Sequence, residues 1–286
     1  MRKDIAKSIK AKLQNISRKD KVAFQTLITR YLYERLLYRL SVSDYKEHFY
    51  LKGGALLFAI EQHYPRPTLD IDFLGIKIKN DLANLKNIFT EICSITCEDD
   101  GVNFDIESIN TIHIAEEKNY KGVRVSVAVK LDSIRQIMKM DIGFGDVIIP
   151  KGKMMEYPCF LEELPEVTIL TYSLESVVAE KFHAMIELSE SNSRYKDFYD
   201  IYQLLSCHSL DFETLSEAIV STFRNRNTEF KENHVIFTDM FVNDSFRVTH
   251  WNNFISKIKY PDKLEFGTVM TLITTELKPI YEKLKQ

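Results

Sequence analysis

Two short motifs in the first quarter of the chain carry residue types suited to phosphate and metal chemistry. The pair Gly53-Gly54 opens an apolar run that predicts a short helix over Ala55–Ile60. Because glycine has no Cβ, both backbone N–H groups can approach a phosphate closely at the start of a helix. Asp70-x-Asp72 follows, and two carboxylates on one face of a strand can share a divalent cation. Together the two motifs indicate nucleotide chemistry.

Both motifs need strands to position them. Phe49–Leu51 is predicted to form a short strand that runs into the glycine pair, and Pro65-Arg66-Pro67 is expected to end the helix and turn the chain. On the strand that follows, Asp70 and Asp72 would share one face, because successive strand side chains point to opposite faces. The apolar residues that alternate with them would enter the core.

A period-two pattern in the middle of the chain predicts two more strands. Every odd position from Val123 to Leu131 is apolar, and from Ile137 to Phe144 one face is again apolar. The two strands are most simply antiparallel. Asp141 lies on the polar face of the second strand, so the predicted sheet presents a third carboxylate. Three carboxylates beside a glycine turn suit Mg²⁺, which prefers oxygen ligands.

Two predicted helices in the second half of the chain carry charges on faces that are otherwise apolar. Lys181 falls within the apolar arc of the helix that follows the expected N-cap Ser173. In the helix predicted over Ser193–Leu205, Asp197 lies inside the arc and Asp200 lies at its edge. Ionised groups are rarely buried without a partner or ligand. Either Lys181 contacts a triphosphate and Asp197 orients it or the attacking group, or the two form a structural ion pair.

The overall composition is that of a globular protein. Of 286 residues, 45% are apolar and 28% are charged, and no stretch approaches the roughly 18 uninterrupted apolar residues of a membrane span. The first residues have no apolar segment of a secretion signal, so a cytoplasmic protein without membrane association is expected. The four cysteines show no C-x-x-C spacing, which favours free thiols over zinc binding or disulfides.

Charge is distributed unevenly along the chain. The net charge is −3, yet residues 1–40 hold eleven Lys or Arg against three acidic residues, a charge of +8 that leaves −11 elsewhere. Such a segment could track a phosphate backbone or dock on an acidic partner, and a solvated helix face is the alternative. Ser17-Arg-Lys-Asp20 has the spacing of a capping box, so a helix is expected to begin at Ser17.

These patterns predict an α+β protein with two lobes. Residues 1–165 are expected to form a mixed sheet flanked by helices, with an N-terminal helical element. Residues 166–286 are expected to form an all-helical lobe, with the site in the cleft between the lobes. The aromatic residues near the end of the chain are predicted to lie in the core: Phe223, Phe230, Phe237, Phe241, Phe246, Trp251, Phe254 and Phe266.

The motifs, taken in order, resemble the AbiEii/AbiGii-type nucleotidyltransferase toxins of the DNA polymerase β-like nucleotidyltransferase superfamily. The resemblance rests on Lys52-Gly53-Gly54-Ala55-Leu56, Arg66-x-Thr68-x-Asp70-x-Asp72, Met140–Asp146, Ala179-Glu180-Lys181 and Lys196-Asp197-x-x-Asp200. It covers residues 50 to about 205. The fifteen residues between the glycine pair and Asp70 exceed the spacing usual in the superfamily.

The resemblance implies a role for each matched residue. Asp70, Asp72, Lys181 and Asp197 are implied to be catalytic, and Asp70, Asp72 and Asp141 to bind metal. Nucleotide binding is implied for Gly53, Gly54, Arg66, Thr68 and Lys181, with Lys52 and Asp200 as additional members of the site.

The family further implies an Mg²⁺-dependent enzyme that transfers NMP from an NTP to an RNA acceptor and releases pyrophosphate. The favoured acceptor is the 3′ end of tRNA, whose modification would inhibit translation. Such enzymes are toxins of toxin-antitoxin systems linked to abortive infection, an antiviral defence, and each has a cognate antitoxin. Three alternatives stay open: transfer to a protein or small molecule, a regulator that binds NTP without transferring it, and an interaction protein without catalytic activity.

Overall fold

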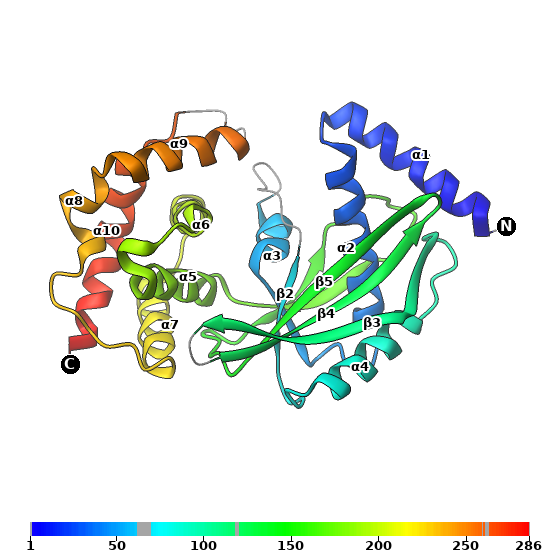
Figure 1. Cartoon of the computed structure of the whole chain (residues 1–286), viewed down its shortest axis with the longest axis horizontal. Coiled ribbons are helices and arrows are strands. Elements are labelled where there is room, and N and C mark those ends of the chain that lie inside the picture. The colour runs from blue at the N-terminus through cyan, green and yellow to red at the C-terminus, as the bar shows by residue number, and fades with distance from the viewer. Residues whose placement is uncertain (1, 62–69, 118–119, 259, 261–262, 286) are drawn as a thin grey trace. The chain divides into compact units, whose positions relative to one another are not determined.

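The computed structural model describes residues 2–61, 70–117, 120–258, 260 and 263–285 (Figure 1). The chain divides into two compact units. The sheet unit contains the first four helices and a seven-stranded sheet, and the helical unit contains the segment Asp146–Gly152 and the chain from Tyr172 onward. The predicted α+β class, with a mixed sheet and helices, is confirmed.

The sheet has the strand order β3-β4-β5-β2-β1-β7-β6. Its strands are β1 (Phe49–Lys52), β2 (Ile71–Gly75), β3 (Val102–Glu117), β4 (Tyr120–Leu131), β5 (Ile134–Phe144), β6 (Lys153–Tyr157) and β7 (Val167–Thr171). The β2–β5 and β1–β7 pairs are parallel, and the other neighbours are antiparallel. The predicted antiparallel pairing of β4 with β5 is therefore confirmed.

Four helices accompany the sheet: α1 (Arg2–Asp20), α2 (Phe24–Ser41), α3 (Gly53–Ile60) and α4 (Leu82–Ser94). The side chain of Asp81 caps α4 by accepting a hydrogen bond from the Asn84 N–H. Figure 1 shows α4 beside β3 and β4, with which it makes contact, while α2 packs against β7 and α4. The apolar faces of these helices and of the strands form the core of this unit.

The predicted helix start at Ser17 is wrong. Ser17 lies in the last turn of α1, where its hydroxyl donates to the carbonyl oxygen of Val22 at 2.7 Å. The chain breaks at Lys21, whose φ is +54°, and α2 begins at Phe24. The serine thus bonds a carbonyl beyond a helix C-terminus instead of an N–H group at a helix N-terminus.

Part of the predicted basic segment lies inside the sheet unit. Arg35 is buried and paired with Glu34, and Arg39 is buried with its Nη1 2.6 Å from a carboxylate oxygen of Asp100. Arg30 is also buried. These three arginines contribute to the core instead of the surface. Exposed basic residues near the start of the chain include Lys7, Lys12, Arg18, Lys19 and Lys21.

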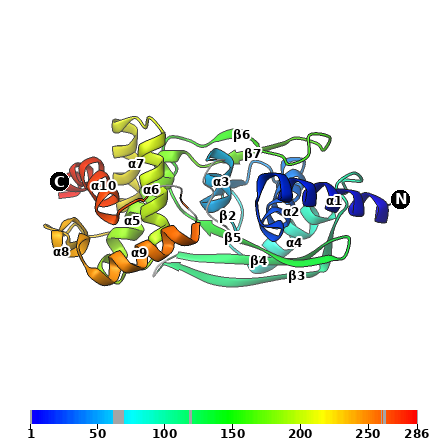
Figure 2. The ribbon, with the colours of Figure 1, turned by 90° about the horizontal axis from the view of Figure 1, so that it is seen from above.

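The helical unit consists of α5 (Leu174–Leu188), α6 (Tyr195–Cys207), α7 (Phe212–Asn225), α8 (Asp239–Val242), α9 (Ser245–Ile258) and α10 (Phe266–Glu282), with short 3-10 turns at Ser189–Ser191, Val235–Phe237 and Lys283–Lys285. Ser173 caps α5 as predicted, since its hydroxyl accepts from the Ser176 N–H. Helix α5 packs against both α6 and α7, and Figure 2 shows the three helices grouped within this unit. Among the described residues, no helix is both long enough and apolar enough to span a membrane.

Aromatic side chains fill the centre of the helical unit. Phe223, Trp251 and Phe266 are buried, as predicted. The prediction is wrong for Phe246, which is 69% exposed. Its ring instead lies 4.0 Å from that of His250, one helical turn later on the surface of α9.

Candidate active site

Four charged residues form one row across the sheet. The register pairs Lys52 with Asp72, Asp72 with Asp141, and Asp141 with Arg124. Residues directly opposite each other on neighbouring strands project from the same face of a sheet. The row, which we call the carboxylate row, therefore places two carboxylates side by side with a cation at each end.

Strand alternation explains why the two carboxylates face away from the core. In β2, Ile71 and Phe73 are fully buried while Asp72 between them is partly exposed. In β5, Met140 and Ile142 are buried and Asp141 lies between them. The structure thus brings Asp72 and Asp141 together, as the sequence predicts, and the parallel β2–β5 pairing is what joins them.

Arg124 holds Asp141 with both arms of its guanidinium group. Its Nε donates to Oδ1 at 2.7 Å and its Nη2 donates to Oδ2 at 2.6 Å. Two parallel charge-assisted bonds of this kind are a strong form of ion pair. Sequence reasoning placed Arg124 on the polar face of its strand without a role. The register of the hairpin, in which Leu131 pairs with Ile134, could have identified it as the partner of Asp141.

The third predicted carboxylate, Asp70, lies directly before β2. Burial, followed by the negative charges of Asp70, Asp72 and Asp141, raises the pKa of the Tyr33 phenol on α2. The hydrogen bond to Asp141 is the largest cause that raises the pKa of Arg124, and the other two carboxylates raise it further. The three carboxylates therefore act on the same neighbouring groups within the sheet unit.

Gly53 lets the turn between β1 and α3 pass close to the carboxylate row. Its φ is +65°, a conformation that other residues rarely adopt. A Cβ placed on Gly53 would lie only 1.9 Å from Oδ2 of Asp72, so no side chain fits there. Gly53 is thus required for the approach of the backbone to Asp72. The expected contact of Gly53 and Gly54 with a phosphate stays a prediction.

Two predicted nucleotide-binding residues, Arg66 and Thr68, lie outside the described residues. Among the residues that the structure describes, no three His, Cys, Asp or Glu side chains form a ready group of metal ligands. Within the carboxylate row, Asp72 and Asp141 are neighbouring oxygen donors. The charge of Asp70 acts on Tyr33 and Arg124, as the charges of Asp72 and Asp141 do.

Lys181 is the centre of an ion cluster in the helical unit. Its Nζ lies 2.8 Å from Oδ1 of Asp197 and 2.7 Å from Oδ2 of Asp200, which joins α5 to α6. Arg194 Nε lies 2.6 Å from the other oxygen of Asp197. The side chain of Lys181 is 11% exposed and that of Asp197 is fully buried. Lys181, Asp197 and Asp200 were identified from the sequence. Of the two alternatives given for Lys181 and Asp197, the structural ion pair is present.

A second polar network in the helical unit was not predicted. Arg226 donates to Nδ1 of His183 at 3.2 Å, so the ring proton is on Nε2, which donates to the Thr228 hydroxyl. Arg226 also pairs with Asp146 at 2.9 Å. Burial, followed by the charge of Arg226, lowers the pKa of His183 to about 3. The histidine is therefore neutral. No sequence motif indicates this network, because its residues come from distant parts of the chain.

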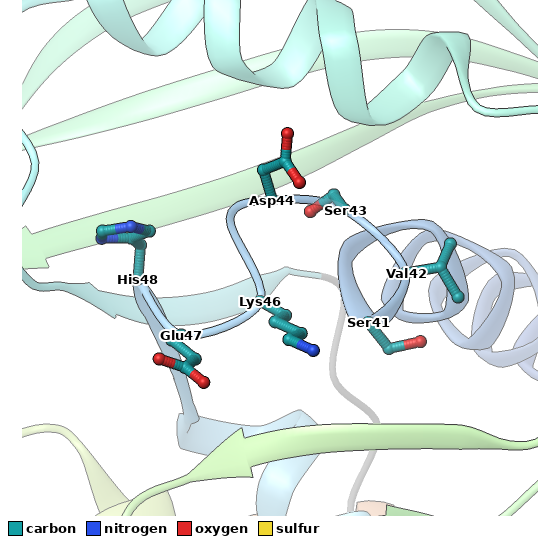
Figure 3. A pocket seen from close by; sticks show the side chains of 7 residues that line it. All are labelled: Ser41, Val42, Ser43, Asp44, Lys46, Glu47 and His48. Atoms are coloured by element: carbon teal, nitrogen blue, oxygen red, sulfur yellow. The ribbon is translucent and has the colours of Figure 1, made fainter.

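Pockets elsewhere in each unit do not include the predicted site residues. One of about 370 Å³ is formed by the loop between α2 and β1 (Figure 3), and its lining residues are Ser41, Val42, Ser43, Asp44, Lys46, Glu47 and His48. Another, of about 290 Å³, lies in the helical unit beside Phe230, Phe237 and Tyr281.

Comparison with known proteins identifies one family, and the similar solved structures include two from Helicobacter pylori. The model of the family described as "Nucleotidyl transferase AbiEii toxin, Type IV TA system" matches residues 35–272. JHP933 from Helicobacter pylori is 14% identical with a TM-score of 0.49, over 92% of this chain and 94% of that chain. An H. pylori protein assigned as a nucleotidyltransferase is 12% identical with a TM-score of 0.48, over 92% and 98%. No curated protein matches.

Proposed function

This chain belongs to the AbiEii family of nucleotidyltransferase toxins, and from that premise we propose that it transfers NMP from an NTP to RNA, with the tRNA 3′ end as acceptor. The family establishes a nucleotidyltransferase of a type IV toxin-antitoxin system. The acceptor, the metal and a role in abortive infection are our proposal. The side-by-side placement of Asp72 and Asp141 is the observation that supports metal-dependent transfer.

The carboxylate row fits a hard divalent cation. Mg²⁺ in nucleotide enzymes is usually held by one or two carboxylates, while water and substrate phosphates complete its shell. Asp72 and Asp141 supply two such carboxylates on adjacent strands, and we assign Asp70 as the third. When bound, the metal would neutralise charge on the triphosphate and on the departing pyrophosphate.

The remaining predicted residues are assigned roles in binding the nucleotide and in the transfer step. In the reaction, an acceptor hydroxyl oxygen bonds to the α-phosphorus of the NTP while the bond to pyrophosphate breaks, and the hydroxyl proton passes to water. We assign Gly53, Gly54, Arg66 and Thr68 to the nucleotide. Lys181 is assigned to the triphosphate, with Asp197 and Asp200 orienting its ammonium group, and Lys52 supports Asp72, its register partner.

Labelled NTPs and total tRNA provide the test. The wild-type protein is expected to place label in RNA, and Asp72→Asn and Asp141→Asn are each expected to lower the rate by about 10³-fold, because each removes one charge from the site. Asp105→Asn is the matched control, since Asp105 is an exposed residue on β3. If the wild-type protein labels no RNA, the proposed acceptor is wrong.

The labelling experiment and three further measurements separate the alternative functions. Label in a protein band or in a small molecule would assign the same site to another acceptor. Tight binding of Mg²⁺-NTP in calorimetry without release of pyrophosphate would indicate an NTP-binding regulator. Cytoplasmic toxicity that the cognate antitoxin relieves, and protection of cells against phage, would support the proposed biological setting.

The exposed basic residues of α1 and the turn after it are proposed to contact the RNA backbone. Reversing the charges of Lys7, Arg18 and Lys19 should weaken RNA binding and reduce its dependence on salt, because fewer phosphate counterions are then released. NTP binding should be unchanged. Unaltered RNA affinity in a filter-binding titration would remove this role from α1.

A further inference from the structure

Arg124 occupies the oxygens that a divalent cation would need. Its guanidinium donates to both oxygens of Asp141, at 2.7 Å and 2.6 Å. In a bidentate pair of this kind, both carboxylate oxygens accept a hydrogen bond from the same guanidinium group. The carboxylate that the proposed function gives to metal is therefore held by a cation of the protein itself.

The carboxylate row explains why a cation is needed at this position. Asp72 and Asp141 are register partners on adjacent strands, and like charges directly opposite each other destabilise a sheet. Asp70 adds a third negative charge that acts on Arg124. Arg124 reduces this repulsion at Asp141, and a divalent cation between the carboxylates would do the same.

The exposure of the pair allows the exchange. The Arg124 side chain is 30% exposed and that of Asp141 is 13% exposed, so the guanidinium can move into water without becoming an unpaired buried charge. Lys52, the cation at the other end of the carboxylate row, is buried. Of the two cations in the row, Arg124 is thus the one that can leave.

We propose that Arg124 is a counter-ion that releases Asp141 when a divalent cation binds, and that it thereby sets the metal affinity of the site. The inference rests on the proposed function, because it takes Asp141 as a metal ligand. Competition from Arg124 keeps the metal affinity of the nucleotide-free enzyme low. Metal then binds best together with a nucleotide, whose phosphates supply further ligands.

The test measures Mn²⁺ binding to the full chain by electron paramagnetic resonance, without nucleotide or RNA. Arg124→Gln is expected to bind Mn²⁺ about tenfold more tightly than the wild-type protein, because the competing charge is gone. Arg124→Lys should lie between them, because it keeps the charge without the fork. Lys130→Gln is the matched control, an exposed residue on the same strand, and should leave Mn²⁺ affinity unchanged.

Equal or weaker Mn²⁺ binding by Arg124→Gln would overturn the proposal, as would the absence of binding in both proteins. Label transfer to RNA is measured separately, so it can succeed while this inference fails. A second measurement is made on the wild-type protein and follows the Arg124 Nε–H signal in nitrogen-15 NMR. The signal is identified by its loss in Arg124→Lys. Its exchange with water should become about tenfold faster on addition of Mg²⁺, because the bond to Asp141 is lost. Unchanged exchange would overturn the proposal.

Discussion

The ion pair at Arg124 and the ion cluster around Lys181 differ in how far solvent reaches them. In the sheet unit, Arg124 and Asp141 form a pair that solvent reaches. In the helical unit, Lys181 and Asp197 are almost completely enclosed between α5 and α6. Removing one partner of an enclosed pair leaves an uncompensated buried charge, whereas water stabilises a charge that is partly exposed. The Arg124–Asp141 pair can therefore exchange partners. The Lys181–Asp197 pair stabilises the helical unit, in addition to any role in catalysis.

The strongest test of this contrast is Lys181→Met. It should lower the free energy of unfolding by about 3–5 kcal/mol, because two buried carboxylates lose their shared cation. Trp251, the single tryptophan, lies in the core of the helical unit, so its fluorescence in a urea titration reports the unfolding of that unit.

Lys196→Met, an exposed lysine on α6, is the control and should change stability by under about 0.5 kcal/mol. A comparably small loss for Lys181→Met would contradict the structural role of the enclosed cluster. Any loss of transfer activity in that variant would then result from the missing contact of Lys181 with the triphosphate, and not from unfolding.

In the sheet unit, Gly53→Ala should be the most damaging small substitution. The added Cβ would collide with Asp72, and the positive φ disfavours alanine, which together cost about 2–5 kcal/mol. Unfolding followed by circular dichroism measures the loss. Gly267→Ala in α10, where the nearest atom is 4.0 Å away, should be neutral or slightly stabilising. Equal stability of the two variants would show that the turn can relax away from the carboxylate row.

Acid should weaken the helical unit through His183. Its pKa is about 3 in the folded protein, against 6.5 for a histidine in water, so between these values the unfolded chain binds more protons. Stability is complete above about pH 6.5 and falls as the pH decreases toward 3, by about 2 kcal/mol between pH 7 and pH 5. Trp251 fluorescence at both pH values, compared with His183→Gln, measures it. An identical pH dependence in His183→Gln would assign the loss to other groups.

The smallest effect is expected at Phe246. Phe246→Ala should change stability by under about 0.5 kcal/mol, because most of the ring already contacts water. Phe223→Ala, in the buried centre of the same unit, should cost about 3–5 kcal/mol. Urea titration of both variants distinguishes the surface of the helical unit from its core.

Local periodicity in the sequence predicted the parts of the fold that alternate regularly. The pattern from Val123 to Leu131 identified β4, and the arcs around Lys181 and Asp197 anticipated that α5 and α6 would bring them together. Strand β3 was not predicted, because its pairing shifts register between Asp105 and Asn110 and this shift interrupts the alternation of apolar residues. Phe246 was misplaced because an aromatic residue alone does not say which face of a helix it occupies.

The interactions that join distant segments were the hardest to predict. Arg124 required knowledge of the β4–β5 register, and the Asp146–Arg226 pair required the packing of α7 against the segment that follows β5. The pairing of Asp72 with Asp141 was anticipated only in that both were expected on the same sheet. Composition and periodicity describe one element at a time, and such contacts depend on how the elements pack.

The parallel pairing of β2 with β5 has a consequence for the synthesis of the toxin. Asp72 leaves the ribosome long before Asp141, because α4, β3 and β4 are made between them. Such a non-local strand pairing forms only after the intervening chain is available. A nascent or truncated chain that stops before β5 therefore lacks Asp141, one of the two carboxylates of the row. With Asp141 in its proposed role, the ribosome must complete most of the sheet unit before nucleotide transfer can begin.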